Sequence, residues 1–189
     1  MKILIIKFRN IGDVLLSTPL ISNLHDIYPN SKIDVALNKG CEDMVSDNPN
    51  INNIIIYDRP RIKKLSLLSQ LKEEIRFARN IRNNHYDMVI NLTEGDRGAQ
   101  LAFFSGAKSK LGFPVRKGLF SKIKIFDKLG DDKKWQHTVE KDLQFINLLG
   151  RNIDNKEVKI YWSSAVEQEV DKILVDNSIE QFVHIHPVS

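Results

Sequence analysis

Apolar runs alternate with amphipathic stretches along the chain. The predicted strands, most of them continuous apolar runs typical of a sheet buried on both faces, are residues 3–6, 32–37, 53–57, 87–92, 110–113, 158–162 and 182–186. The predicted helices, with apolar positions at helical spacing, are residues 14–24, 42–46, 65–82, 97–104, 138–149 and 165–175. This alternation predicts an α/β fold with a doubly wound, mostly parallel sheet and right-handed crossovers.

Composition agrees with a folded protein. The 189 residues suit one main domain, and 42% apolar with 28% charged residues is close to globular averages. No apolar run approaches the roughly 20 residues of a membrane span, and residues 3–6 are too short for a signal peptide. The single cysteine, Cys41, has no disulfide partner. We therefore expect a protein that stays in the reducing cytoplasm.

Charge is distributed unevenly. The formal net charge is +4, but residues 59–126 carry +10 and the segments on either side are negative. Residues 106–126 hold six cations and no carboxylate. This segment either attracts an anionic partner or is a solvated face balanced by the acidic last third, and the sequence leaves both open. The polar stretch 114–134 is expected to be a loop that orders over a ligand.

The first predicted strand ends in the turn Lys7-Phe8-Arg9-Asn10-Ile11-Gly12-Asp13. Ligands of doubly wound sheets bind outside the carboxyl ends of the strands, so this turn is a candidate site. It has neither the dinucleotide-binding nor the phosphate-loop glycine pattern. Lys7 and Arg9 suit an anionic substrate, and Asp13 suits a general base for a bound hydroxyl. Asp13 also suits an N-cap of the following helix, which spacing alone favours.

A second polar turn, Thr93-Glu94-Gly95-Asp96-Arg97-Gly98, follows the strand at residues 87–92. Thr93, Asp96 and Arg97 suit recognition of hydroxyl and phosphate groups. The alternative is a capped helix start in which Arg97 pairs with Asp96 or Glu94. Both turns are expected at one edge of the sheet, and their coincidence is better evidence for a site than either turn alone.

No metal site is predicted. His184 and His186 share one face of the last predicted strand, but they lack a third ligand. The sequence contains no HExxH helix and no GxSxG turn. Neither a metal nor a cofactor is therefore expected.

The segment from Lys7 to Leu20 resembles the N-terminal signature of the lipopolysaccharide heptosyltransferases, glycosyltransferase family nine. Residues 91–99, 105–107 and 112–113 are similar to the branch that adds the third, side-branch heptose of the inner core. Further matching segments follow in the expected order at residues 137–140 and 185–189. The resemblance spans nearly the whole chain.

This resemblance implies the GT-B arrangement, in which two Rossmann-like domains face a cleft. The N-terminal half would bind the acceptor and the C-terminal half ADP-heptose. Residues 1–180 would then be the acceptor-binding domain, and residues 181–189 the start of a donor-binding domain whose remainder is absent. Ser189 would be a donor contact, although Val188 stands where the family more usually has a hydroxyl residue. This half alone is expected to be inactive.

The resemblance also implies a reaction. Asp13 matches the family's proposed catalytic carboxylate, which would deprotonate an acceptor hydroxyl for inverting attack on the anomeric carbon, displacing ADP without a metal. This implication overrides the N-cap preference for Asp13. The expected acceptor contacts are Lys7, Arg9, Asn10, Gly12, Thr93, Asp96, Arg97, Arg116 and Lys117. The candidates for holding phosphates or an anionic membrane surface are Arg61, Lys63, Lys64, Arg116 and Lys117.

The expected partners are the lipopolysaccharide inner core, a nucleotide-sugar donor bound through the absent domain, and the inner face of the inner membrane as a peripheral contact. Nucleic acid is not an expected partner. Two other classes stay open. Basic residues and capped turns at strand ends are sufficient for a non-catalytic, anion-binding module of flavodoxin-like form. The other class, nucleic-acid binding through the basic middle third, is the least expected.

Overall fold

The computed structural model describes residues 1–116, 118–132 and 136–183. Within them, six strands form one sheet in the order β3-β2-β1-β4-β5-β6, and every pair of neighbours is parallel. The strands are β1 (Lys2–Lys7), β2 (Lys32–Asn38), β3 (Asn53–Tyr57), β4 (Met88–Asn91), β5 (Ser109–Gly112) and β6 (Lys128–Leu129). From β1 the chain adds β2 and β3 on one side, and from β4 it adds β5 and β6 on the other. This order confirms the predicted doubly wound α/β fold.

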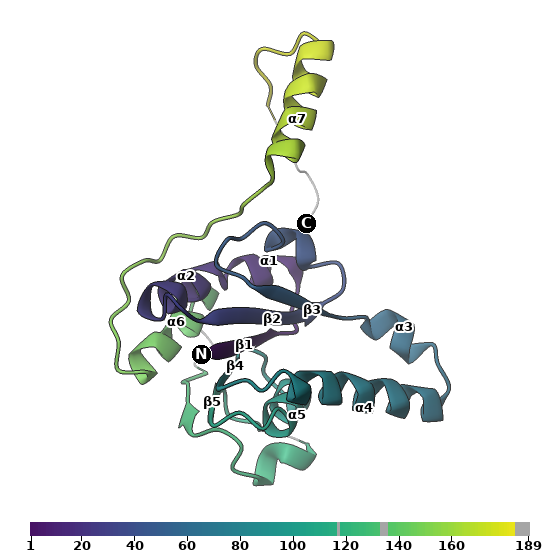
Figure 1. Cartoon of the computed structure of the whole chain (residues 1–189), viewed down its shortest axis with the longest axis vertical. Helices are drawn as coiled ribbons and strands as arrows, with labels where there is room; N and C mark the ends of the chain where they lie inside the picture. Colours follow the sequence, from purple (N-terminus) through teal and green to yellow (C-terminus); the bar gives the residue numbers. More distant parts are fainter. Residues whose placement is uncertain (117, 133–135, 184–189) are drawn as a thin grey trace.

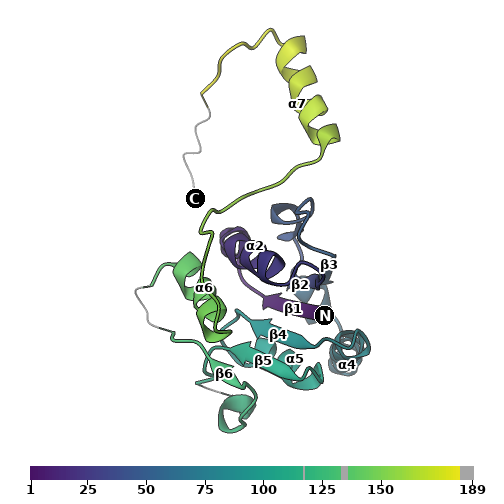
Figure 2. The same ribbon diagram turned by 60° about the vertical axis from the view of Figure 1, so that its left-hand side comes forward.

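Helices cover both faces of this sheet (Figures 1 and 2). Their bounds are α1 (Ile11–Leu15), α2 (Thr18–Ile27), α3 (Arg59–Lys63), α4 (Leu67–Asn83), α5 (Asp96–Phe104), α6 (Thr138–Leu148) and α7 (Ser164–Asp176), with 3₁₀ turns η1 (Glu42–Met44) and η2 (Leu119–Lys122). Residues of α1, α2 and α6 share one core cluster, and residues of α3, α4 and α5 share the other. The sheet is therefore the middle layer of three.

Side chains of the central strand alternate between these two cores. Ile3 and Ile5 of β1 pack on the α2 and α6 side, whereas Leu4 and Ile6 pack on the α4 and α5 side. All four are fully buried. Burial of a side chain of this size contributes roughly 1.5–3 kcal/mol relative to exposure. A strand between two helical layers therefore needs an uninterrupted apolar run.

The predicted helix at residues 14–24 is wrong in one respect, because it is two helices. α1 ends at Leu15 and α2 begins at Thr18. Pro19 in the first turn of α2 has no N–H to donate to the Leu15 carbonyl. That carbonyl accepts instead from the Thr18 hydroxyl at 2.8 Å. The side chain thus replaces a backbone bond that a continuous helix would have.

The strand predicted at residues 158–162 is also wrong. The chain from 151 to 163 has no regular secondary structure and passes α2 on its way to α7 (Figure 2). The Lys159 N–H donates to Oγ1 of Thr18 in α2 at 3.2 Å instead of pairing with a strand. The alternating residues Val158, Ile160 and Trp162 stay more than a third exposed, because no sheet edge lies beside them.

The end of the chain also departs from its pattern. Helix α7 projects away from the sheet and contains no buried residue (Figures 1 and 2). Of the strand predicted at residues 182–186, residues 182–183 are not in a strand, and His184 and His186 lie outside the described residues. In the part of the chain that is described, no helix is both long and apolar enough to cross a membrane.

Order appears in places where the pattern predicts none. Both η2 and β6 lie inside the loop predicted at 114–134, and α3 was not predicted. Helix α3 starts at a capping residue, Asp58, whose carboxylate accepts from the Arg61 N–H at 3.0 Å, with Pro60 in its first turn. Its five residues are too few to show helical periodicity. The capping sequence was the available signal.

Candidate active site

The predicted turns meet at the switch point of the sheet. β1 and β4 are neighbours, and the turns that follow them start α1 and α5. The Phe8 N–H donates to Oγ1 of Thr93 at 2.8 Å, which ties the two turns together. The Asn91 side chain holds the second turn, accepting from the Thr93 N–H at 3.1 Å and donating to its carbonyl at 3.0 Å. The predicted coincidence of the turns is confirmed, with Thr93 as the link.

Asp13 stands in the first turn of α1, two residues past the helix start. The N-cap is Asn10, so the N-cap interpretation of Asp13 is wrong. Asp13 is half-buried, and no described residue donates a hydrogen bond to its carboxylate. Its oxygens are therefore available to accept a proton from a bound hydroxyl.

A buried ion pair lies close to Asp13. Nζ of Lys7 is 2.6 Å from Oδ2 of Asp142 in α6, and both side chains are almost fully buried. Burial raises the pKa of Asp142 to about 6, the Lys7 ammonium opposes this, and the negative charge of Asp13 adds to it. Lys7 thus reaches inward from the end of β1 and fixes α6 against the turn that follows this strand.

Next to this pair, one carboxylate interacts with two cations from other parts of the chain. Nη2 of Arg9 is 3.2 Å from Oε2 of Glu94, and Lys141 of α6 donates to the same carboxylate. The Lys141 ammonium, and then Arg9, hold the pKa of Glu94 below its ordinary value. Glu94 therefore stays ionised and positions the Arg9 guanidinium.

Two hollows open around Arg9. One, of about 370 Å³, is lined by Arg9, Glu94, Gly95, Pro114, Arg116 and Asp132. In it, Nη2 of Arg116 is 2.6 Å from Oδ1 of Asp132. The other, of about 420 Å³, is lined by Arg9, Asn10, Ile11, Gly12, Asn38, Lys39, Gly40 and Cys41. The structure thus brings Arg9, Asn10, Gly12 and Arg116 to adjoining hollows at one edge of the sheet.

Arg97 turns away from these hollows. Its guanidinium lies over the Tyr57 ring, 4.3 Å from the centroid, and is 3.2 Å from Oε1 of Glu74 in α4. The alternative in which Arg97 pairs with Asp96 or Glu94 is therefore wrong. Nη1 of Arg97 is buried with no partner among the described residues.

Asp96 lies beneath Gly118, which has a φ of +99°. A Cβ on Gly118 would be 1.6 Å from Oδ2 of Asp96, so the close approach of these two segments requires glycine. Oδ1 of Asp96 is buried and lacks a partner within the described segments. Two other predicted contacts, Lys117 and Ser189, lie outside those segments.

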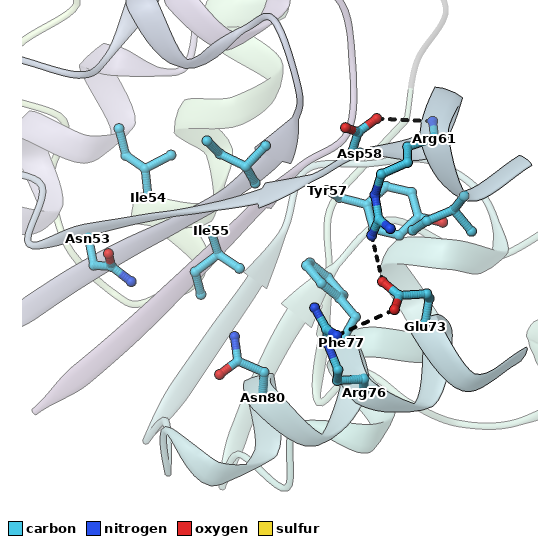
Figure 3. Close-up of a pocket in the computed structure, with 12 residues that line it drawn as sticks. Asn53, Ile54, Ile55, Tyr57, Asp58, Arg61, Glu73, Arg76, Phe77 and Asn80 are labelled. Carbon is cyan, nitrogen blue, oxygen red and sulfur yellow. Dashed lines mark hydrogen bonds and ion pairs between the residues drawn. The ribbon is translucent and has the colours of Figure 1, made fainter. Parts of the chain in front are cut away.

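Another predicted cation lies at the edge of the sheet. Arg61 of α3 borders a hollow of about 520 Å³ between β3 and α4 (Figure 3). Its Nη2 is 2.6 Å from Oε2 of Glu73, and Nη1 of Arg76 is 3.4 Å from the other oxygen of that carboxylate. Arg61 is thus positioned by α4 near the carboxyl end of β3.

Sequence reasoning missed the contribution of α6. Lys141 and Asp142 were not singled out, yet both reach the turns. The available signal was Asp142 itself, a carboxylate within the apolar stripe of Val139, Leu143 and Ile146. A charge at such a position is expected to have a buried partner.

Gly98 offers a test of how the second turn is held. A Cβ at this position would lie 2.1 Å from Oδ1 of Asn91, the amide that holds Thr93. We expect Gly98→Ala to displace this amide and lower the free energy of unfolding by about 1–3 kcal/mol, measured by urea denaturation. Gly12→Ala is the control, because nothing lies within 4 Å of its Cβ and alanine favours a helix. Equal effects of the two substitutions would contradict this role of Gly98.

Solved structures of sugar transferases share this fold. The glycosyl transferase family 9 structure from Veillonella parvula DSM 2008 has a TM-score of 0.75 at 21% identity, covering 94% of this chain and 49% of that one. Escherichia coli heptosyltransferase WaaC with ADP-2-deoxy-2-fluoro heptose has a TM-score of 0.70 at 23% identity, covering 84% and 51%. These likenesses show a shared fold.

Sequence comparison identifies the family to which the chain belongs. The profile described as glycosyltransferase family 9 (heptosyltransferase) matches residues 74–181. Lipopolysaccharide heptosyltransferase 3 of E. coli strain K12 is 37% identical over 83 residues, which are 44% of this chain and 23% of that protein. The chain therefore belongs to glycosyltransferase family 9. It spans less than two thirds of the length of these relatives.

Proposed function

We propose that this chain is the acceptor-binding half of an inverting heptosyltransferase, which transfers heptose from ADP-heptose to the inner core of lipopolysaccharide. Residues 1–180 form that half, and a donor-binding domain begins at residue 181. Support comes from the family and from relatives that are lipopolysaccharide heptosyltransferases. E. coli WaaC, which shares the fold, is solved with ADP-2-deoxy-2-fluoro heptose.

One observation carries the proposal. The carboxylate of Asp13 stands without a hydrogen-bond donor among the described residues at the switch point of a doubly wound sheet. It directly follows Gly12, which borders the hollow of about 420 Å³ together with Arg9. A carboxylate beside fixed cations can take a proton from a hydroxyl of a molecule that the cations hold by its phosphates.

The chemical step follows from this placement. An oxygen of Asp13 accepts the proton of the acceptor hydroxyl, and the freed oxygen forms a bond to the anomeric carbon of heptose. The bond from that carbon to the phosphate oxygen breaks, and ADP leaves with the electron pair. Attack opposite the leaving group inverts the anomeric centre. Asp13 ends the step protonated and returns the proton to solvent.

The cations have separate parts in binding. Arg9 and Arg116 face the hollow of about 370 Å³, while Arg61 stands at the neighbouring end of β3. We assign the binding of acceptor phosphates to these three arginines and to three lysines, Lys63, Lys64 and Lys117. Lys7 is buried against Asp142, so its part is to hold the turn. The protein is proposed to act in the cytoplasm, at the inner face of the inner membrane.

The test joins this chain to its donor-binding half. The joined protein is incubated with ADP-heptose and heptose-deficient core lipopolysaccharide in the presence of a chelator, and ADP release and product mass are followed. We expect a mass gain of one heptose and no change in rate when the chelator is omitted. A rate that requires added divalent cation would contradict the metal-free step.

The same assay separates the other class of function. A folded protein that binds core lipopolysaccharide but releases no ADP with any nucleotide sugar would be an anion-binding module. Transfer from another nucleotide sugar would keep the enzyme class and change the donor.

A further inference from the structure

The outer face of α4 and α5 is apolar and exposed. On α4, Leu68 and Leu71 are 76% and 58% exposed, and on α5 Phe104 is 46% exposed. A groove of about 380 Å³ runs between the two helices, lined mainly by apolar atoms of Leu71, Ile75, Ala78, Leu101 and Phe104. The helices lie side by side on the face of the sheet opposite α2 and α6 (Figures 1 and 2). A contiguous apolar surface of this kind marks an interaction site.

Aromatic rings extend this surface beyond the groove. The rings of Phe103, Phe104 and Phe120 contact one another edge to face, with centroids 5.3–6.3 Å apart. Ile123, which follows η2, is also exposed. The apolar surface therefore combines one face of α4, the end of α5 and the η2 segment, and we call it the α4–α5 surface.

Cations border the α4–α5 surface. Arg79 and Arg82 line the groove, and neither forms an ion pair among the described residues. Lys122 and Lys124 flank Ile123, and both are exposed. The carboxylate in the groove, Glu74, is already paired with Arg97. The border is therefore positively charged.

We propose that the α4–α5 surface docks on an anionic lipid bilayer. Apolar side chains on one face of a helix enter the boundary between headgroups and acyl chains, while arginine and lysine at the border bind lipid phosphates. Charge favours this occupant over a second copy of the chain, since two copies face to face would bring Arg79 and Arg82 of each against the other.

This docking deepens the proposed function, in which the acceptor is a glycolipid. α3 and the first turn of α4 follow the carboxyl end of β3, and α5 follows that of β4. Parallel strands present their carboxyl ends at one edge, so the N-terminal ends of α4 and α5 lie toward the edge that carries the hollows of the candidate active site. A bilayer on this surface would present sugars at that edge.

Vesicle flotation tests the docking without donor or acceptor. The 189-residue chain is mixed with vesicles of phosphatidylglycerol and phosphatidylcholine in equal amounts, or of phosphatidylcholine alone. We expect binding to the anionic vesicles that falls with added salt, and weak binding to the neutral ones. The assay contains no heptose or lipopolysaccharide, so its result does not depend on sugar transfer. Absence of vesicle binding would overturn the docking and leave the proposed transfer untouched, and absence of transfer would leave the docking untouched.

Paired variants assign the binding to this surface. Leu68→Gln with Leu71→Gln is expected to weaken partitioning at least tenfold, and Arg79→Gln with Arg82→Gln about fivefold for each charge removed. The controls are Val175→Gln, as exposed as Leu68, and Lys172→Gln, both on α7. Circular dichroism confirms that each variant is folded.

Three results would overturn the docking. The first is equal binding to neutral and anionic vesicles. The second is an equal loss in the α7 controls, which would move the interaction to another surface. The third is a dimer in analytical ultracentrifugation that Leu68→Gln with Leu71→Gln dissociates, which would make the α4–α5 surface a contact between copies.

Discussion

Replacing Asp13 by Asn in the protein joined to its donor-binding half is expected to lower kcat by about 10²–10⁴-fold. The amide has nearly the same shape as the carboxylate but cannot accept the proton of the acceptor hydroxyl. No described residue donates to the carboxylate in this structure, so its loss breaks no hydrogen bond and the fold is expected to persist. Steady-state rates of ADP release measure the effect.

The design of this experiment separates catalysis from binding. Because the amide leaves Arg9 and Arg116 in place, KM for the acceptor is expected to change little while kcat falls. Asp26→Asn is the matched control, because this exposed carboxylate lies near the C-terminal end of α2, away from the turn between β1 and α1. Turnover of Asp13→Asn at the rate of this control would remove Asp13 from the role of base.

The position of Asp13 shows how much of the site is readable from sequence. A continuous apolar run predicts a strand that is buried on both faces. In a parallel sheet, the turn that follows such a strand lies at the edge formed by the carboxyl ends of the strands. The locations of Asp13 and Thr93 at one edge follow from this rule alone. The interaction partners of each side chain cannot be predicted in this way, because they come from elements that are distant in sequence.

Arg97 and Lys7 illustrate that limit. Both sit in turns where a ligand was expected, yet Arg97 stacks on Tyr57 and Lys7 pairs with Asp142, 135 positions away. An arginine or lysine has a long, flexible stem, so the nearest complementary charge in space decides its direction. Periodicity gives the face of a helix, but it does not give the partner of a polar residue on that face.

The strand predicted at residues 158–162 fails for a related reason. Alternating apolar residues describe a half-buried surface, and the structure decides whether a sheet edge lies there. The edges of this sheet are β3 and β6, and neither is beside this segment, which contacts α2 instead. Local pattern predicts strands well only where the fold brings them together.

Breaking the Lys7–Asp142 pair is expected to have the largest effect on stability. Either Lys7→Met or Asp142→Leu leaves a buried charge without its partner, and each is expected to lower the free energy of unfolding by about 3–5 kcal/mol. The double variant is expected to recover much of this loss, because two apolar side chains of similar size fill the same space. Urea denaturation of all four proteins gives the coupling free energy.

An exposed ion pair supplies the matched control. Nζ of Lys156 is 2.9 Å from Oε1 of Glu140 on the surface of α6, and both side chains are solvent-accessible. Lys156→Met is expected to cost at most about 1 kcal/mol. If Lys7→Met cost no more than Lys156→Met, the buried pair would not hold α6 against the turn that follows β1.

The pH dependence gives an independent check on this pair. The pKa of Asp142 in the folded protein, about 6, lies above its ordinary value, so the folded state binds a proton that the unfolded state lacks between these values. This contribution to stability is therefore present at low pH and is lost as the pH rises through about 6. Without Lys7, that pKa rises further, because the opposing charge is gone. The cost of Lys7→Met should thus be smaller at about pH 5, where Asp142 is neutral, than at about pH 7. A cost independent of pH would instead point to lost packing of the Lys7 stem.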